Sequence, residues 1–324
     1  QAHRVQQLPV CCLIAWVVCF SAVRGDEPES TRLRVMTYNA QFLPSLAAAF
    51  NERKEPAYRA EQIGRRVADF DLIGFNEVFE RNHRRTLLAQ LQSAWGENYH
   101  VYEHPEPEEN RVNGGLTIVS RLPIVATDFV TFENYSKPED YGFRADGFAA
   151  KGVLYVQLAR NSDAAEEDAS ADRLDVFVTH LEARADDMRE LQYAELAGFL
   201  KQHTAADRPA ILLGDMNTDG RPPARSAADS AYRRMLAHYD AGRAGGTWTD
   251  VWPALRGDAL GGTQRQETTE RGKRIDYVFI SNPTAGGSRL KPLQVEVDGM
   301  LDDRVVALSD HSAVWAELEW LPAE

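Results

Sequence analysis

The chain has 324 residues, of which 44% are hydrophobic and 26% charged, and its formal net charge at pH 7 is −13. Its length and apolar content suffice for one large domain or two small ones, and the lack of a Pro/Gly/Ser-rich linker favours one domain. The acidic charge argues against nucleic-acid binding, although bound divalent cations or a local basic patch can replace overall positive charge.

The first 25 residues have the pattern of an export signal. Arg4 precedes an apolar stretch over residues 8–23, which is too short for a comfortable membrane span, and small residues follow it. We expect residues 1–25 to be a signal peptide, or alternatively a retained N-terminal anchor. Residues 26–324 are expected to form the folded domain.

All three cysteines, Cys11, Cys12 and Cys19, lie in this segment, so a chain that starts near Asp26 contains none. An exported protein without disulfides depends on its core for stability, which is typical of a secreted or periplasmic bacterial enzyme. We therefore expect the protein to be exported.

Beyond this segment, short apolar runs typical of strands alternate with fewer helical patterns. Strands are expected near residues 33–38, 71–77, 115–120, 124–131, 150–158, 173–181, 209–214, 273–281, 291–297 and 312–320. Helical periodicity is found near residues 57–69, 83–95, 187–203 and 226–238. This order predicts two packed sheets flanked by helices.

Two connections between the predicted strands differ in character. Residues 159–172 are rich in Ala, Asp, Glu and Ser, which predicts a solvated hairpin loop. Residues 132–148 form a longer connection, with four aromatic residues among charges: Tyr135, Tyr141, Phe143 and Phe148. Such a loop either flanks a substrate or covers the edge of a sheet.

Polar side chains gather at the ends of the predicted strands. The apolar run 210–213 is followed by Asp215 and Asn217, and residues two apart in an extended segment point the same way. These two side chains can therefore bind the same polar ligand. A hard cation together with a phosphate oxygen is the natural candidate for that ligand. Further strand ends carry Asn39, Asn76 with Glu77, His180, Asp276, and Asp310 with His311.

The oxygen donors in this set suit magnesium, which is typically held by one or two carboxylates together with substrate phosphate and water. Glu77, with Asn39 beside it, could supply the protein's share of one site. That site could be completed or extended by Asp215, Asn217 and Asp310.

The histidines suit cleavage of a phosphodiester, which requires activation of water, neutralisation of charge at phosphorus and stabilisation of the leaving oxygen. One of His180 and His311 could act as the base and the other as an acid or phosphate donor. A base histidine needs a carboxylate that fixes its tautomer, and Asp276 is the candidate partner of His311.

Six motifs follow one another along the chain: Tyr38-Asn39, Asn76-Glu77-Val78, Thr179-His180-Leu181, Gly214-Asp215-Met216-Asn217, Ile275-Asp276-Tyr277 and Ser309-Asp310-His311. The series resembles the ordered signature of the endonuclease/exonuclease/phosphatase superfamily and covers nearly all of residues 26–324. The resemblance implies an α/β (α+β) fold, a DNase-I-like four-layer αββα sandwich of two mixed β-sheets.

The resemblance also implies roles for the metal and phosphate ligands. Glu77 would be the principal Mg²⁺ ligand, with Asn39 supporting it, and Asp310 would help to bind the metal. Asp215 and Asn217 would orient water and phosphate. Other divalent cations such as Mn²⁺ or Co²⁺ are alternatives to Mg²⁺.

The same resemblance implies roles for the histidines. His311, paired with Asp276, would be the general base. His180 would bind the scissile phosphate and stabilise the transition state.

Further segments resemble the neutral sphingomyelinase branch of the superfamily. They are Glu77-Val78-Phe79-Glu80, the glycine-rich residues 113–124, and Ala150-Lys151-Gly152-Val153-Leu154-Tyr155. The resemblance implies that Lys151 approaches the substrate phosphate. The alternative is that Lys151 is a structural lysine at the surface.

Two features depart from that branch. Glu80 stands where the branch has Asp, and residues 282–308 contain no Trp, Tyr or Phe. Bacterial sphingomyelinases commonly insert an aromatic hairpin there to enter the lipid interface. Its absence weakens the expectation of efficient attack on intact membranes.

Three functions therefore remain open. The first is a secreted phospholipase-C-type phosphodiesterase that acts on sphingomyelin or a related phospholipid. The second is an extracellular nuclease, or a phosphatase of soluble phosphoesters, and the third is a binding protein on a silent scaffold. We expect a monomer that binds a phosphodiester substrate, lipid or nucleic acid, and needs no obligate protein partner.

Overall fold

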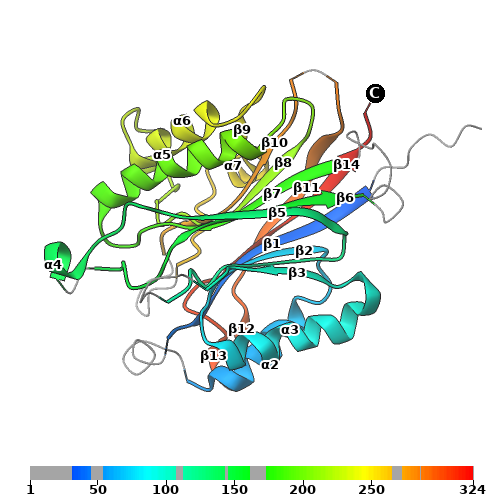
Figure 1. Cartoon of the computed structure of the whole chain (residues 1–324), viewed down its shortest axis with the longest axis vertical. Coiled ribbons are helices and arrows are strands. Elements are labelled where there is room, and N and C mark those ends of the chain that lie inside the picture. Colours follow the sequence, from blue (N-terminus) through cyan, green and yellow to red (C-terminus); the bar gives the residue numbers. More distant parts are fainter. Residues whose placement is uncertain are drawn as a thin grey trace, which may run out of the picture.

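The computed structural model of the chain describes residues 31–44, 54–106, 112–142, 145–160, 173–264, 272–284 and 286–323. Two six-stranded sheets lie at its centre, packed face to face (Figure 1). The predicted export signal, residues 1–25, lies outside the described residues. Among the described helices, none has the length and apolar character needed to cross a membrane.

The first sheet has the strand order β11-β14-β1-β2-β4-β3. It is mixed, because β1 runs parallel to β2 and antiparallel to β14. Its strands are β1 (Thr31–Phe42), β2 (Leu72–Val78), β3 (His100–Glu103), β4 (Thr117–Ser120), β11 (Arg289–Asp298) and β14 (Ala313–Leu321).

The second sheet has the order β5-β6-β7-β8-β10-β9 and is also mixed, since only β7 and β8 are a parallel pair. Its strands are β5 (Ile124–Thr131), β6 (Gly152–Ala159), β7 (Arg173–His180), β8 (Ala210–Asp215), β9 (Trp248–Asp250) and β10 (Asp276–Ser281). A separate small hairpin pairs β12 (Leu301–Asp302) with β13 (Val306–Ala307).

Helices cover the outer faces of both sheets (Figure 1). On the first sheet these are α2 (Pro56–Arg66) and α3 (Arg81–Trp95), and on the second α5 (Asp186–His203) and α6 (Ala231–Ala241). The shorter α4 (Pro138–Tyr141) and α7 (Val251–Arg256), and the 3₁₀ turns Gly96–Asn98 and Ala224–Ser226, lie in connections. The four-layer αββα sandwich of two mixed sheets is confirmed.

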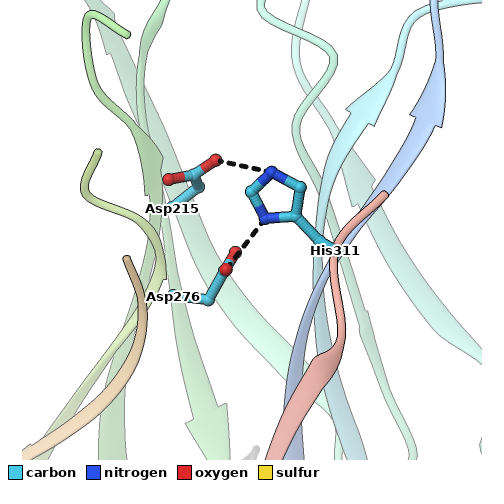
Figure 2. A group of neighbouring side chains, drawn as sticks. All are labelled: Asp215, Asp276 and His311. Atoms are coloured by element: carbon cyan, nitrogen blue, oxygen red, sulfur yellow. Dashed lines mark hydrogen bonds and ion pairs between the residues drawn. The ribbon is translucent and has the colours of Figure 1, made fainter. Parts of the chain in front are cut away.

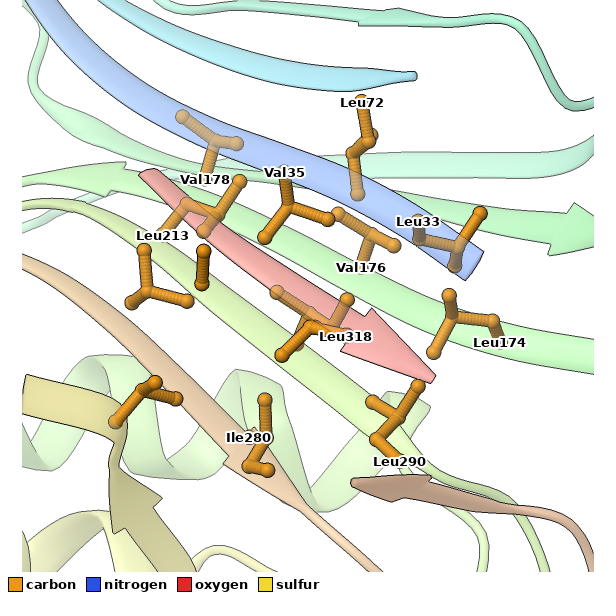
Figure 3. Packing of buried hydrophobic residues seen from close by; sticks show 14 of the residues in the cluster. Leu33, Val35, Leu72, Leu174, Val176, Val178, Leu213, Ile280, Leu290 and Leu318 are labelled. Carbon is orange, nitrogen blue, oxygen red and sulfur yellow. The ribbon is translucent and has the colours of Figure 1, made fainter. Parts of the chain in front are cut away.

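Strand alternation explains why the sheets form layers. On β1, Leu33 and Val35 point into the space between the sheets, whereas Met36 and Tyr38 pack under the helices of the first sheet. On β7, Val176 faces the other sheet in the same way (Figure 3). Both faces of the central strands are therefore apolar, as expected of strands buried on both sides.

All ten strands and all four helices expected from the sequence are present, with shifted ends. α6 begins at Ala231 rather than at 226, because Ser230 caps it by accepting a hydrogen bond from Arg233 N. β6 and β7 form the expected antiparallel hairpin, while residues 161–172 of its loop lie outside the described residues. The sequence does not reveal β3, β9, β12, β13, α4 and α7, which are too short to show a period.

Candidate active site

The inward rows of side chains change from apolar to polar at one end of the sandwich. On β1 this row runs Leu33, Val35, Thr37, Asn39, as the alternation of a strand requires. The rows of four other strands reach the same end at Asn76, His180, Asp215 and Asp276. The polar groups therefore meet between the sheets, where they are shielded from water.

Strand register places three of these groups abreast in the second sheet. His180 on β7 is the Cα partner of Asp215 on β8, and Asp215 is in turn the partner of Asp276 on β10. In the first sheet, Asn39 and Asn76 are partners in the same way. Residues far apart in the sequence thus become neighbours because their strands end at the same level.

Asn39 bridges the two sheets. Its Nδ2 donates to Glu77 Oε1 at 2.9 Å and to Asp215 Oδ2 at 3.2 Å, and its Oδ1 accepts from Gln41 N at 3.1 Å. Ser309 Oγ donates to the backbone oxygen of Asn39 at 2.7 Å. This contact brings the segment that contains Asp310 and His311 to the same place.

Two residues of the site have left-handed backbone conformations. Glu77 has φ 56° and Asn217 has φ 49°, a region that non-glycine residues seldom occupy. Asn217 is held there because its N donates to Asp215 Oδ1 at 3.0 Å and its Nδ2 to Leu181 O at 3.0 Å. Conformations of this kind persist where the surroundings fix them, and they gather at functional sites.

His311 lies between two aspartates (Figure 2). Its Nδ1 is 2.8 Å from Asp276 Oδ2, and its Nε2 is 3.8 Å from Asp215 Oδ2. Burial disfavours the charged imidazolium, but Asp276, Asp215 and Asp310 together raise the pKa of His311 well above its ordinary value. The ring therefore binds a proton strongly, and in its neutral form Asp276 keeps the proton on Nδ1 and leaves Nε2 as the acceptor.

His180 has the opposite character. Burial, together with the charges of Lys151 and His311, lowers its pKa well below the ordinary value, so the ring is neutral. Its Nε2 is 3.2 Å from Lys151 Nζ and 3.6 Å from Asp215 Oδ2. Because a lysine ammonium only donates, Nε2 accepts and the proton of this neutral ring is on Nδ1.

Lys151 is a buried cation, with 4% of its surface accessible. Its Nζ donates to Leu181 O at 2.8 Å and forms an ion pair with Asp146. These contacts fix a positive charge beside His180, where it can neutralise an anionic group.

The carboxylates of the site suit a divalent cation. Burial, followed by the charge of Asp310, raises the pKa of Glu77 to about 7, and burial with Asp276 raises the pKa of Asp215 to about 7. Crowded buried carboxylates are destabilised unless they are protonated or bind a cation. Glu77 and Asp310 offer oxygen ligands, and this donor set fits Mg²⁺.

Asp215, Asp276 and His311 form a second group of potential metal ligands, with ligand atoms that all lie within 4.8 Å of one another. However, Asp276 Oδ2 and His311 Nδ1 already share a hydrogen bond of 2.8 Å. A cation between them would have to break it. Asp276 is therefore better suited to orient the imidazole of His311 than to bind a metal.

The site opens into a cleft of about 230 Å³. Its polar lining comprises Glu77, His180, Lys151, Asp146 and Arg184. The cleft is wide enough for a phosphate ester, and the cations in its wall suit an anionic ligand.

The structure brings together every site residue expected from the sequence: Asn39, Glu77, Lys151, His180, Asp215, Asn217, Asp276, Asp310 and His311. Sequence reasoning missed Asp146, the ion-pair partner of Lys151, because no motif contains it. It also assigned no role to Arg59 or Ser309, whose importance depends on contacts with distant backbone.

Comparison with known proteins agrees with this geometry. The model of the Endonuclease/Exonuclease/phosphatase family matches residues 36–311. The chain belongs to this family. The family's match ends at His311 and contains all the site residues named above.

Individual relatives of this chain include sphingomyelinases. Sphingomyelinase DDB_G0288017 of Dictyostelium discoideum is 27% identical over 201 residues, 52% of this chain and 42% of that protein. Two other relatives, from Caenorhabditis elegans and Leptospira interrogans, are matched over 61% and 31% of their lengths. The chain thus spans less than two thirds of the relatives it matches.

Solved structures share the fold at low identity. A mutant of beta toxin from Staphylococcus aureus with bound magnesium ions has a TM-score of 0.61 at 16% identity, covering 88% of this chain and 99% of that one. D. rerio TDP2 complexed with a single-strand DNA product has a TM-score of 0.58 at 16% identity, covering 89% and 99%.

Proposed function

We propose that this protein is a Mg²⁺-dependent phosphodiesterase that hydrolyses the head-group phosphodiester of a phospholipid, as sphingomyelinases do. The observation that carries the proposal is the imidazole of His311, oriented by Asp276 at 2.8 Å, beside buried carboxylates and a buried lysine. A proton acceptor, anionic metal ligands and a fixed cation are the groups that phosphodiester hydrolysis requires.

Glu77 and Asp310 would hold the cation, and Asn39 supports Glu77 through its hydrogen bond of 2.9 Å. When bound, a divalent cation supplies positive charge to the phosphate oxygens. Mn²⁺ or Co²⁺ could take the same oxygen ligands. The magnesium ions in the beta toxin structure support this choice.

The remaining residues move the proton and neutralise the phosphate. A water molecule transfers its proton to Nε2 of His311, its oxygen bonds to phosphorus, and the bond from phosphorus to the substrate alcohol breaks. The alcohol leaves after taking a proton from a second water molecule, and the proton held by His311 returns to the hydroxide formed in that transfer. Lys151 binds the phosphate through its charge, neutral His180 orients the Lys151 ammonium by accepting from it at 3.2 Å, and Asp215 and Asn217 orient water and phosphate.

Two observations support a lipid substrate. Relatives of this chain are named as sphingomyelinases, and residues 150–155, which contain Lys151, resemble a segment of that branch. An extracellular nuclease or a soluble phosphoester phosphatase is the second candidate, and it is favoured by the DNA product bound to TDP2. The net charge of −13 opposes that alternative, because it repels a polyanion. The export signal over residues 1–25 and a monomeric state remain part of the proposal.

The test is a hydrolysis panel with the purified protein and Mg²⁺. The substrates are sphingomyelin, phosphatidylcholine, single- and double-stranded DNA, and inositol phosphates. We expect release of choline phosphate from a phospholipid, lost on addition of EDTA and restored by Mg²⁺. Shortened DNA without choline phosphate release would instead establish the second candidate.

A further inference from the structure

One half of the cleft at the proposed active site is apolar. Its lining comes from four separate segments, namely Leu43 with Pro44, Phe79, Val112, and Phe148 with Ala149. We call these six residues the apolar wall. None of them has a role in the chemistry at phosphorus, so the wall needs a separate explanation.

The wall lies between the phosphate-binding groups and solvent. Lys151 is 4% exposed and His180 is 2% exposed, whereas Phe148 is 65% exposed and Val112 is 37% exposed. The phosphate site is therefore at the bottom of the cleft, and Phe148 is at its mouth. A ligand bound through its phosphate would pass along the wall on its way out.

The exposed side chains are held on a fixed backbone. Val112 N donates to Phe148 O at 3.1 Å, and Ala150 N donates to Val112 O at 2.7 Å. The two segments form a β-bridge between Val112 and Ala149. Because this backbone is tied down, a bound ligand is the simplest way to cover Phe148.

We propose that the apolar wall binds the alcohol part of the substrate, and that this alcohol carries a long aliphatic chain. The inference deepens the proposed phosphodiesterase function and rests on it. An aliphatic chain attached to the phosphate would bury Phe148, Val112 and Phe79, which favours binding in proportion to the area covered. An exposed phenylalanine also stacks on a nucleobase, but Leu43, Pro44 and Val112 offer only aliphatic surface, which suits an aliphatic chain better.

The experiment measures kcat/KM for butyl, hexyl and octyl esters of choline phosphate, each kept below the concentration at which it forms micelles. Complete burial of a methylene group corresponds to about a fourfold gain. For the wild-type protein we expect kcat/KM to rise at least tenfold from the butyl to the octyl ester. In Phe148→Ser this ratio should fall by at least threefold, and in Phe148→Leu it should be largely retained.

The matched control is Leu191→Ser, which removes a side chain of 45% exposure from α5, outside the cleft lining. It should keep the wild-type dependence on chain length. A wild-type protein that cleaves all three esters equally well would overturn the proposed alcohol site, and so would a Phe148→Ser variant with an unchanged ratio. The phosphodiesterase proposal would survive both results.

Two further outcomes would give Phe148 or the cleft a different role. If Phe148→Ser weakens binding to sphingomyelin vesicles but keeps the ratio for monomeric esters, Phe148 contacts the lipid surface and the alcohol site is wrong. If the wild-type protein cleaves none of the choline esters but cleaves a dinucleotide, the phospholipid function fails and the aliphatic alcohol site fails with it.

Discussion

The orientation of His311 depends on one carboxylate. Asp276 Oδ2 holds Nδ1 at 2.8 Å, which leaves Nε2, 3.8 Å from Asp215 Oδ2, as the ring nitrogen that can take a proton. An aspartate in this position fixes the tautomer and stabilises the imidazolium that forms when the ring takes a proton. The charge of Asp276 is also one cause of the raised pKa of His311.

Asp276→Asn should therefore lower kcat/KM by about 10²- to 10⁴-fold, because both the tautomer and the charge are lost. The pKa of His311 should fall, so the acidic limb of the pH–rate profile should move to lower pH. The control is Asp258→Asn, which neutralises a carboxylate with 84% side-chain exposure. An Asp276→Asn enzyme with an unshifted profile would contradict the role given to this residue.

The raised pKa of Glu77 predicts that metal binding depends on pH. In the metal-free protein its pKa is raised to about 7, chiefly by burial and then by Asp310. A proton bound to Glu77 competes with the cation, so the affinity should fall as the pH drops below about 7.

Calorimetric titration with Mg²⁺ should show Kd rising about tenfold from pH 8 to pH 6, as expected when one group of pKa about 7 must lose its proton. Glu77→Gln should bind Mg²⁺ far more weakly at every pH. A Kd that is constant over this range would show that Glu77 is not a ligand that titrates with the metal.

Helix α2 contributes to the site through Arg59, which is fully buried. Its guanidinium donates to the backbone oxygens of Ala40 at 3.0 Å, Gln41 at 2.9 Å and Leu308 at 2.7 Å. It therefore ties the end of β1, next to Asn39, to the residue just before Ser309. The first of these segments carries Asn39 and the second carries Asp310 and His311, so Arg59 joins two parts of the proposed site.

Arg59→Met should lower the free energy of unfolding by about 3 kcal/mol, because buried carbonyl oxygens lose their donors. It should also lower kcat, since Asp310 and His311 would shift relative to Asn39. Urea denaturation and steady-state kinetics measure the two effects. Arg65→Met on the same helix, with 58% side-chain exposure, should change stability by no more than about 0.5 kcal/mol.

The β12–β13 hairpin carries a strained residue. Val306 has φ 68° and is 72% exposed, although a β-branched side chain is poorly suited to this conformation. Val306→Gly should raise the free energy of unfolding by about 1 kcal/mol through relief of this strain. A destabilised variant in thermal and urea unfolding would show that Val306 contributes contacts that outweigh the strain.

Long elements were predictable because their patterns span several periods, as in β1 and α5. The grouping of the site residues was predictable too, because most of these polar residues lie at or next to the end of an apolar strand. The pairing of those strands then places the polar residues side by side. Arg59 could not be assigned, since one helical arginine looks like any other. Its carbonyl partners at 40, 41 and 308 are defined only by the folded chain.

At the level of the whole molecule, the net charge of −13 should affect access to the substrate. An acidic protein is repelled by an anionic lipid surface, and added salt screens this repulsion. The rate on vesicles that contain anionic lipid should therefore rise as NaCl increases from about 20 to 150 mM, over which the Debye length falls to about 8 Å.

Hydrolysis of the same substrate in purely zwitterionic vesicles provides the control and should change little with salt. A rate on anionic vesicles that falls with salt would indicate that a local basic patch, rather than the overall charge, governs the approach to the surface.

The most direct test of the central claim is a crystal of this protein soaked in Mn²⁺, with the metal located by anomalous scattering. We predict a peak within ligand distance of the Glu77 carboxylate and beside Asp310, with the hydrogen bond between His311 and Asp276 intact. A peak between Asp276 and His311, or none near Glu77, would contradict the account.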